Sequence, residues 1–280
     1  MNRYLAIIIL TTIFALIYSC KENEGLLTDP NNVVPSESVL IPLSPINSQI
    51  ILNISEDIST SNSNVVLSCY TRNLYSPAGS KILSDFSLVN NSIQIEFKEL
   101  KMSEMGAGIS APASVKFNLG SLPNGYYSLN ITINGKKVIG LITINDESFE
   151  LKIQPNNLIS IYQEKLLRIP SSIIWGQSES IEQTPFQLFI DSLIVLGAKP
   201  HNLNAGDYSY FEVDTQGGFN THSALGMPYG KYFLYNYEGD STSIRNLIKR
   251  FAKRYLDSIY IQLSGGKGEM YYSTVLRNEP

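Results

Sequence analysis

Hydrophobic and polar residues alternate with a period of two over much of residues 49–154. The runs Ile93–Phe97, Val115–Leu119 and Tyr127–Ile133 each place every second side chain on one face, as a strand does between a core and water. The pair Asn134-Gly135 follows the third run and favours a type I′ hairpin turn. About seven such runs with no helical pattern between them predict an antiparallel β-sandwich.

One part of this region carries a resemblance to a known module. Ser121–Ile144 contains Leu-Pro-Asn-Gly-Tyr-Tyr-Ser-Leu, then the Asn-Gly turn, then Gly-Leu-Ile-Thr-Ile. It resembles the last hairpin of the immunoglobulin-like modules that follow the lipid anchor in many Bacteroidetes lipoproteins. The resemblance implies an immunoglobulin-like spacer over residues 49–154 and carries no catalytic motif.

The pattern changes to α+β after Pro155. Thr184 as N-cap, Pro185 as first helical residue and Gln187 as partner in a capping box predict a helix that ends at Gly197. A second helical stripe covers Ile244–Leu256. We expect strands at the following ranges: Ile173–Trp175, Tyr208–Val213, Lys231–Tyr237, Ser258–Leu263 and Met270–Val275.

The first four of these strands alternate with the two helices in the order strand, helix, strand, strand, helix, strand. This order predicts a ferredoxin-like βαββαβ domain over residues 155–280. A weaker similarity, over Gly125–Gly218, is to the interleukin-like EMT-inducer domain. It rests on the order of elements and on Leu196-Gly197-Ala198.

The N-terminus has the features of an export signal. Arg3 precedes an apolar run, Leu5–Ile17, which is too short to cross a bilayer, and Cys20 follows a small residue. This resembles the bacterial lipobox, which implies a signal peptide at residues 1–19 and diacylation of Cys20. The alternative is a plain secretory signal with a chance cysteine.

Residues 21–24 and the stretch after them indicate where the chain is displayed. Lys21-Glu22-Asn23-Glu24 resembles the surface-export signal of Bacteroidetes lipoproteins, and four prolines up to residue 48 predict an extended stalk over residues 20–48. We therefore expect an outer-membrane lipoprotein that faces the cell exterior, the alternative being the periplasmic face. The membrane would be contacted through the lipid on Cys20.

Composition excludes some classes of function. The 280 residues include 21 Lys and Arg against 25 Asp and Glu, so general nucleic-acid binding is not expected. Two His and two Cys are too few for a structural zinc site, and we predict neither a metal nor a cofactor. With Cys20 acylated, Cys69 has no disulfide partner and is expected to lie buried in a strand.

Two serines resemble hydrolase nucleophiles. Gly239-Asp240-Ser241 is similar to the nucleophile block of SGNH hydrolases, but both histidines precede Ser241, whereas those enzymes have theirs downstream. Trp175-Gly176-Gln177-Ser178 resembles a related esterase block, and His201 and His222 do follow Ser178. A serine hydrolase that uses Ser178 is therefore kept as an alternative function.

Aromatic residues favour recognition over catalysis. Ten of the 17 tyrosines lie between Tyr208 and Tyr272, and tyrosine combines a flat apolar ring with a polar rim. We predict that the C-terminal domain binds a glycan or an envelope protein without chemistry, through Tyr229, Tyr232 and Trp175. The alternatives are that the tyrosines fill strand faces, or that the protein is a structural subunit of an envelope assembly.

The second predicted helix is strongly basic. Its five cationic residues stand without an acid between them: Arg245, Lys249, Arg250, Lys253 and Arg254. Such a helix suits an anionic lipid or an acidic partner, but it is also what a solvated face opposite a sheet looks like. Gly265-Gly266-Lys267-Gly268, which lacks the Ser/Thr of a phosphate loop, is expected to be a tight connection between strands.

Overall fold

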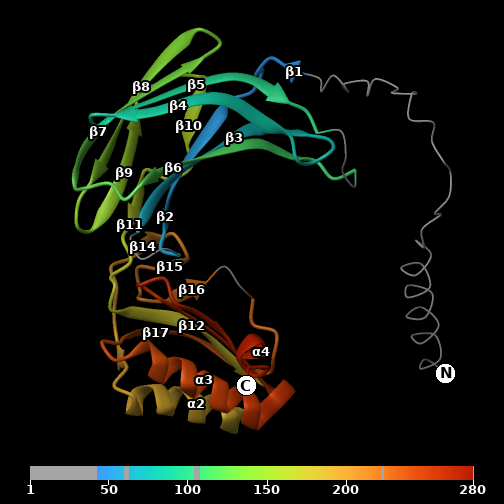
Figure 1. The fold of residues 1–280 in the computed structure, drawn as a ribbon, viewed down its shortest axis with the longest axis vertical. Coiled ribbons are helices and arrows are strands. Elements are labelled where there is room, and N and C mark those ends of the chain that lie inside the picture. The colour runs from blue at the N-terminus through green and yellow to red at the C-terminus, as the bar shows by residue number, and fades with distance from the viewer. Residues whose placement is uncertain (1–42, 60–62, 104–107, 222–223, 280) are drawn as a thin grey trace, which may run out of the picture. The chain divides into compact units, whose positions relative to one another are not determined.

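The computed structural model describes residues 43–59, 63–103, 108–221 and 224–279, and Figure 1 shows their arrangement. The strands of this part of the chain form a 14-stranded mixed sheet and a five-stranded antiparallel sheet. The described chain is therefore rich in β-structure, as the alternation predicted, but the large sheet is not purely antiparallel as we expected: Ser92–Phe97, for example, pairs in parallel with Ser128–Ile133.

The large sheet takes strands from most of the described chain. Its strands are β1 (Leu43–Ser44), β2 (Ile50–Asp57), β3 (Asn64–Tyr75), β4 (Lys81–Val89), β5 (Ser92–Lys101), β6 (Ala111–Gly120), β7 (Gly125–Ile133), β8 (Lys136–Ile144), β9 (Ser148–Ile153), β10 (Ile159–Ile161), β11 (Lys165–Leu167), β14 (Gly206–Tyr208), β15 (Phe211–Val213) and β16 (Phe219–Thr221). The order is β10-β2-β3-β6-β4-β5-β7-β8-β9-β11-β14-β15-β16, and β1 pairs with β5.

Alternating side chains build the core of the large sheet. In β5 the odd-numbered Ile93, Ile95 and Phe97 are buried, and in β7 so are Leu129 and Ile131, while their neighbours face solvent. These residues share one core with the inward side chains of β2, β3, β6, β8 and β9. Burial of every second apolar side chain is the driving force for this arrangement.

The predicted turn between β7 and β8 is confirmed. Asn134 and Gly135 both have positive φ, 50° and 73°, and the two strands pair from Ile133 and Lys136 outward. Asn tolerates this conformation and Gly has no Cβ to oppose it, so the local sequence is sufficient to set the turn.

The small sheet has helices on one face. It consists of β12 (Ile173–Ser180), β13 (Lys199–Pro200), β17 (Tyr229–Asn236), β18 (Ile259–Gly265) and β19 (Met270–Tyr272), in the order β13-β17-β12-β18-β19. The helices are α2 (Gln183–Val195), α3 (Ser241–Tyr255) and α4 (Ser273–Leu276), and the 3-10 helix η1 (Leu256–Ser258) follows α3. Figure 1 shows α2 and α3 on one side of the small sheet, and apolar residues of both helices share one core with one face of β12, β17 and β18.

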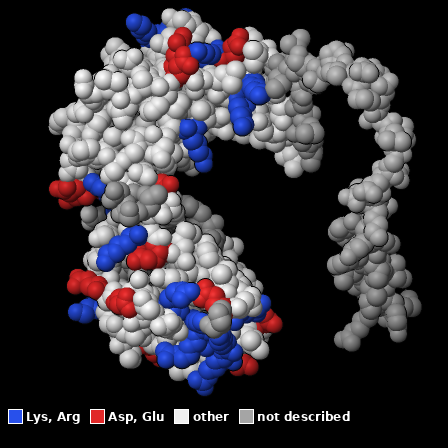
Figure 2. Space-filling view, viewed as in Figure 1, with Lys and Arg blue, Asp and Glu red and all other residues white. Residues whose placement is uncertain are grey.

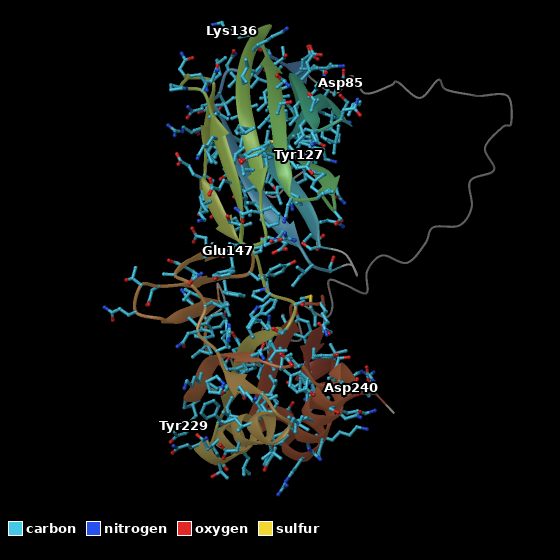
Figure 3. All side chains as sticks on the ribbon, turned by 90° about the vertical axis from the view of Figure 1, so that its left-hand side faces the viewer. Asp85, Tyr127, Lys136, Glu147, Tyr229 and Asp240 are labelled. Carbon is cyan, nitrogen blue, oxygen red and sulfur yellow. The ribbon has the colours of Figure 1, made fainter. Side chains whose placement is uncertain are left out.

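The start of α2 differs from the capping prediction, whereas α3 has a side-chain cap. α2 begins at Gln183 after Glu182, which forms no side-chain cap, so the prediction that Thr184 is the N-cap is wrong. Pro185 still lies in the first turn, where a missing N–H leaves no helical hydrogen bond unmade. α3 is capped by Asp240, labelled in Figure 3, whose Oδ1 accepts a hydrogen bond from the Thr242 backbone N–H at 3.1 Å.

Two predicted strands are also corrected. The predicted strand Tyr208–Val213 is a hairpin of β14 and β15 that belongs to the large sheet, because a turn at Ser209-Tyr210 reverses the chain. The small sheet has the two-residue β13 at that edge instead. At the C-terminus, β19 stops at Tyr272 and the next residues form α4. Alternation alone does not show which sheet a short strand joins.

The end of the predicted stalk and the first residues of the predicted second domain both belong to the large sheet region. Leu43–Ser48, the end of the predicted stalk, lies against the large sheet: Ile46 is buried, and its carbonyl accepts a hydrogen bond from Asn134 Nδ2 at 2.9 Å. Beyond residue 155 the chain still adds β10 beside β2 and β11 beside β9. The signal peptide and the rest of the stalk lie outside the described residues, and the boundary at residue 155 stays a prediction.

Candidate functional site

The candidate site lies on the face of the small sheet that carries no helix. The central strand β12 is buried along its whole length because both of its faces are covered. Ile174 faces the helices, whereas Trp175 joins a different cluster with Tyr208, Phe211 and Val213 of the large sheet. Alternation along β12 then places Gln177 and Glu179 on the helix-free face together with Trp175.

The three residues predicted to bind a ligand do not form one surface. Trp175 is 3% exposed, and its ring centroid lies 5.9 Å from that of Tyr210 and 5.2 Å from that of Phe211. Tyr232 lies opposite Gln177 and is half-buried on the same face. Tyr229, labelled in Figure 3, lies opposite Ser180 on the helix side and is 43% exposed.

The split follows from strand geometry. Residues three apart in a strand point to opposite faces, so Tyr229 and Tyr232 are separated once β17 forms. The structure brings Trp175 and Tyr232 to one face and leaves Tyr229 on the other. A ligand that contacts the rings of both Tyr229 and Tyr232 would have to extend around the edge of the sheet.

A cavity of about 280 Å³ opens beside Trp175 on this face, and we refer to it as the amide pocket. Its lining residues come from β12, β18 and β19 of the small sheet, from the turn between β14 and β15, and from β16: Trp175, Gly176, Gln177, Ser209, Tyr210, Thr221, Gln262, Ser264 and Met270. None of these side chains carries a charge at neutral pH. Burial raises the pKa of Tyr210, so its phenol keeps its proton.

Two amides lie side by side in the lining of this pocket. Gln177 in β12 and Gln262 in β18 are direct partners in the antiparallel register, which places their side chains on the same face. Gly176 precedes Gln177 in β12, and a Cβ there would meet the Gln262 carbonyl oxygen at 2.0 Å. The glycine therefore allows β12 and β18 to approach closely at the base of the pocket.

Neighbouring residues fix the orientation of both amides. Gln177 Nε2 donates to Glu179 Oε1 at 2.8 Å, which leaves its Oε1 as an acceptor. The Tyr260 hydroxyl donates to Gln262 Oε1 at 3.2 Å, which leaves Nε2 of that residue as a donor. The two amides thus offer one acceptor and one donor, the pair that a hydroxyl group can satisfy at once.

Glu179 acts as a structural anchor in this site. Its carboxylate is 3% exposed and accepts hydrogen bonds from the backbone N–H groups of Gly226 and Met227 as well as from Gln177. Because these donors use the charge of the carboxylate, Glu179 positions Gln177 and is not itself presented to a ligand.

Tyr232 lines a second, neighbouring cavity of about 250 Å³. His201, Phe219 and Lys231 lie in the same wall. The Phe219 ring packs edge-on against the Tyr232 ring, with centroids 6.5 Å apart. This cavity differs from the amide pocket in that Lys231 brings a positive charge into its wall.

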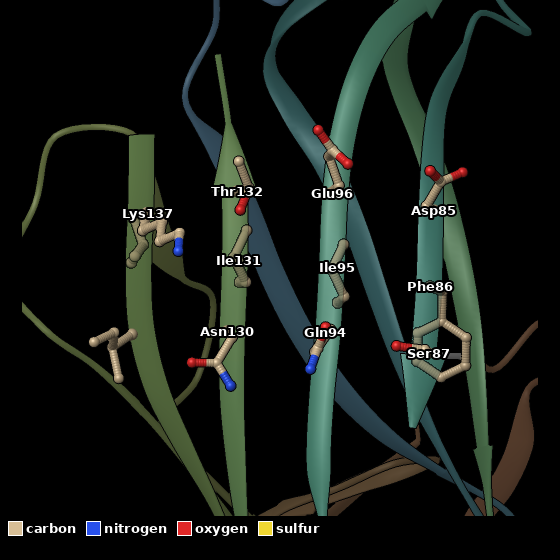
Figure 4. A pocket seen from close by; sticks show the side chains of 12 residues that line it. Asp85, Phe86, Ser87, Gln94, Ile95, Glu96, Asn130, Ile131, Thr132 and Lys137 are labelled. Carbon is tan, nitrogen blue, oxygen red and sulfur yellow. The ribbon is translucent and has the colours of Figure 1, made fainter. Parts of the chain in front are cut away.

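A larger hollow than the amide pocket lies on the large sheet, and we call it the sheet groove. It measures about 680 Å³ and crosses β4, β5, β7 and β8. Figure 4 shows two rows of outward side chains, and the strand register accounts for both: Asp85, Glu96, Thr132 and Lys137 in one row, and Ser87, Gln94, Asn130 and Ile139 in the other. No tyrosine or tryptophan lines it, and its charged ends are exposed, with Asp85 paired to Lys98 at 2.5 Å.

The alternative nucleophile Ser178 is enclosed. It lies on the helix-facing side of β12, is 0% exposed, and its hydroxyl has no hydrogen-bond partner among the described residues. His201 lies in a separate exposed segment, and His222 is outside the described residues. No hydrogen bond joins Ser178 to His201. Ser241, the other serine that resembles a nucleophile, is the first residue of α3, and the preceding Asp240 caps this helix.

The residues missed in the sequence are Gln177, Tyr210, Thr221 and Gln262. Tyr210 was counted among the clustered tyrosines, but nothing in the local pattern distinguished it. The amides gave no signal because glutamine on a strand is ordinarily a solvated residue. The two glutamines meet only because β12 and β18 become neighbours in the sheet. Along the chain, these strands are separated by α2, five strands, α3 and η1.

The two cysteines, the possible metal ligands and the possible membrane spans complete the set of predicted sites. Cys69 lies buried in β3, as expected, and burial raises the pKa of its thiol far above the usual range. Cys20 lies outside the described residues. In the part of the chain that the structure covers, no group of three or more His, Cys, Asp or Glu is arranged to hold a metal ion. No helix there is both long and apolar enough to span a bilayer.

No family model matches the chain, and neither a curated protein nor a solved structure matches it. The function has to be inferred from the geometry of the site.

Proposed function

We propose that this protein is a lipid-anchored cell-surface protein that recognises a neutral glycan, without catalysis, at the amide pocket. The single observation that carries the proposal is the chemistry of that pocket. Trp175 and Tyr210 supply aromatic surface, and Gln177 and Gln262 supply an oriented acceptor and donor. Sugars offer apolar C–H faces and hydroxyl groups, which match these two features.

The size and the neutrality of the pocket narrow the ligand class. At about 280 Å³ it lies just below the roughly 300–1,000 Å³ of sites for drug-sized ligands, which suits one sugar unit of a chain. No charged residue lines it, so an anionic ligand would gain no ion pair. A partner protein, the other predicted ligand, usually binds a broader and flatter surface than this cavity.

The proposed placement at the cell surface rests on the sequence of the N-terminus. Cys20 would carry the lipid, and residues 21–42 would act as the tether to the large sheet. We favour the cell exterior over the periplasmic face because a glycan-binding protein on the outer surface can reach polysaccharides outside the cell.

For the fold, we propose an immunoglobulin-like module and a ferredoxin-like module. The alternation and the hairpin of β7 and β8 support the first. The order β18-β12-β17-β13 supports the second, because a βαββαβ plait places its first strand between its fourth and third, with the second at the edge. In this scheme β13 takes the place that we had expected for Tyr208–Val213.

The serine-hydrolase alternative has no observation in its favour, since Ser178 is enclosed beneath the helices. The alternative of a structural envelope subunit also lacks a supporting feature. Neither is proposed further.

The emission of Trp175, the single tryptophan of the chain, provides a direct test. The full-length chain is titrated with an α-glucan, a β-glucan, an α-mannan and a xylan while tryptophan fluorescence is followed. We expect at least one polysaccharide to change the emission saturably and to be recovered chemically intact. Gln262→Met, which keeps the side-chain length but removes the amide, should weaken that binding about tenfold.

The matched control is Gln94→Met in the sheet groove, which should leave the affinity unchanged. If none of the four polysaccharides alters the emission, the proposal of glycan binding at this pocket is wrong. Equal weakening by both glutamine variants would show that the pocket is not the binding site.

A further inference from the structure

The outward side of α3 is a concentrated patch of positive charge. Figure 2 shows Lys and Arg side chains gathered over this helix. We call the patch the basic helix face and define it as Arg245, Lys249, Arg250, Lys253 and Arg254; no acidic residue occurs between Ser241 and Tyr255.

The fold forces these cations to one side. Ile244, Leu247, Ile248 and Phe251 recur at helical spacing and are buried against the small sheet. The basic residues occupy the rest of the helical circumference, and Arg250, Lys253 and Arg254 are exposed. Arg245 is paired with Glu279 at the side of α4, and the guanidinium of Arg254 lies 5.3 Å from the centre of the Tyr255 ring. Like charges this close repel one another, and an anionic partner would relieve the repulsion.

Exposed aliphatic side chains lie in the same helical layer. α2 packs beside α3, with the Phe189 and Phe251 rings in edge contact at 5.5 Å. On α2, Leu188, Ile194 and Val195 are 41%, 47% and 86% exposed. None of the five cavities described for the structure is lined by these aliphatic residues.

We propose that the basic helix face, together with the exposed aliphatic residues of α2, docks on an anionic lipid surface. The Lys and Arg side chains would meet lipid phosphates, and the short aliphatic side chains would enter the headgroup region. The apolar face of α3 stays in the core of the domain, so the helix does not insert. An acidic protein would satisfy the cations but would leave the scattered aliphatic residues without a partner.

This docking is independent of the amide pocket. The helices cover one face of the small sheet and the pocket lies on the other, so a domain that rests on lipid through its helices leaves the pocket uncovered. The proposal also does not need the lipid on Cys20, because its contacts all come from α2 and α3.

The test is co-sedimentation of the full-length Cys20→Ala chain with vesicles. One set is pure phosphatidylcholine and the other is equal parts phosphatidylcholine and phosphatidylglycerol. The ratio of binding to the two sets is the readout, because the apolar segment Leu5–Ile17 contributes to both. We expect about tenfold stronger binding to the anionic vesicles, lost at high salt.

Charge-reversal variants locate the interaction. Arg250→Glu, Lys253→Glu and Arg254→Glu together should abolish the preference for anionic vesicles. The matched control reverses three exposed lysines of the large sheet and its rim, Lys136, Lys137 and Lys165, and should keep the preference. If both triple variants lose the preference for anionic vesicles equally, the preference depends only on the net charge of the protein, and the proposal is wrong.

The aliphatic contribution separates a lipid from an acidic protein. Val195 is highly exposed, so the Val195→Ser variant should fold normally. We expect this variant to bind the anionic vesicles severalfold more weakly. If Val195→Ser has no effect and polyglutamate binds as tightly as the vesicles, the surface fits an acidic protein and the lipid proposal is wrong. The absence of any preference for anionic vesicles would also reject it.

Discussion

The carboxylate of Glu179 accepts a hydrogen bond from the backbone N–H of Met227 at 2.8 Å, although 48 residues of chain separate them. The Gly226 N–H and Gln177 Nε2 donate to the same carboxylate. One buried acid therefore holds the segment before β17 against β12 and sets the orientation of an amide in the proposed binding pocket.

Glu179→Ala should lower the free energy of unfolding by about 2–3 kcal/mol, because it leaves buried N–H donors without an acceptor. The same variant should weaken any ligand that contacts Gln177, since that amide loses the bond that orients it. Urea unfolding measures the stability, and Glu182→Ala, an exposed residue of the same segment, is the control that should change little. An unchanged urea midpoint for Glu179→Ala would contradict the anchoring role.

Ser178→Ala should leave stability unchanged or raise it by up to about 1 kcal/mol, because the lost hydroxyl is buried and has no hydrogen-bond partner among the described residues. Ser180→Ala is the matched variant: its hydroxyl donates to the Glu182 carbonyl, and we expect a loss of about 1 kcal/mol. Thermal unfolding of the two variants gives the comparison. Esterase activity that vanishes in Ser178→Ala would restore the hydrolase alternative.

Gly135→Val should destabilise the large sheet by about 1 kcal/mol or more, because φ at this position is +73° and a β-branched residue is strained there. A Cβ would meet nothing within 4 Å, so the cost is conformational and not a clash. Gly135→Asn tests this directly, since asparagine tolerates positive φ and should cost much less. Equal unfolding midpoints for the Val and Asn variants would show that backbone strain is not the cause.

The Cys69 thiol should be inert in the folded protein. Burial raises its pKa, so the reactive thiolate is disfavoured, and the thiol reacts with an alkylating reagent only after unfolding. In the Cys20→Ala chain Cys69 is the single thiol, so mass spectrometry before and after addition of urea reads it alone. Rapid alkylation without denaturant would mean that β3 opens readily.

Cys20→Ala should abolish palmitate labelling and membrane retention of the protein in cells, because Cys20 is the only acylation site that the sequence predicts. Cys69→Ala serves as the matched control and should retain the label. Label that persists on the Cys20 variant would overturn the lipoprotein assignment.

The sequence by itself determined the features that depend on neighbours along the chain. The alternation in Ile93–Phe97 and Tyr127–Ile133 predicted strands with the correct buried faces, and Asn134-Gly135 predicted the turn between β7 and β8. The apolar stripe of α3 was equally clear. Each of these signals arises within a few residues, where the backbone conformation and the direction of the side chains follow from spacing alone.

Tertiary structure alone decided which strands became neighbours, and with them the candidate site. Tyr208 and Phe211 belong to the large sheet because β14 pairs with β11 and β15 pairs with β14, and no local pattern specifies these partners. Gln177 and Gln262 meet because β18 pairs with β12, far away in the sequence. A strand completes its hydrogen bonds with any suitable partner, so the choice is made by the packing of the whole domain, which no single segment of sequence contains.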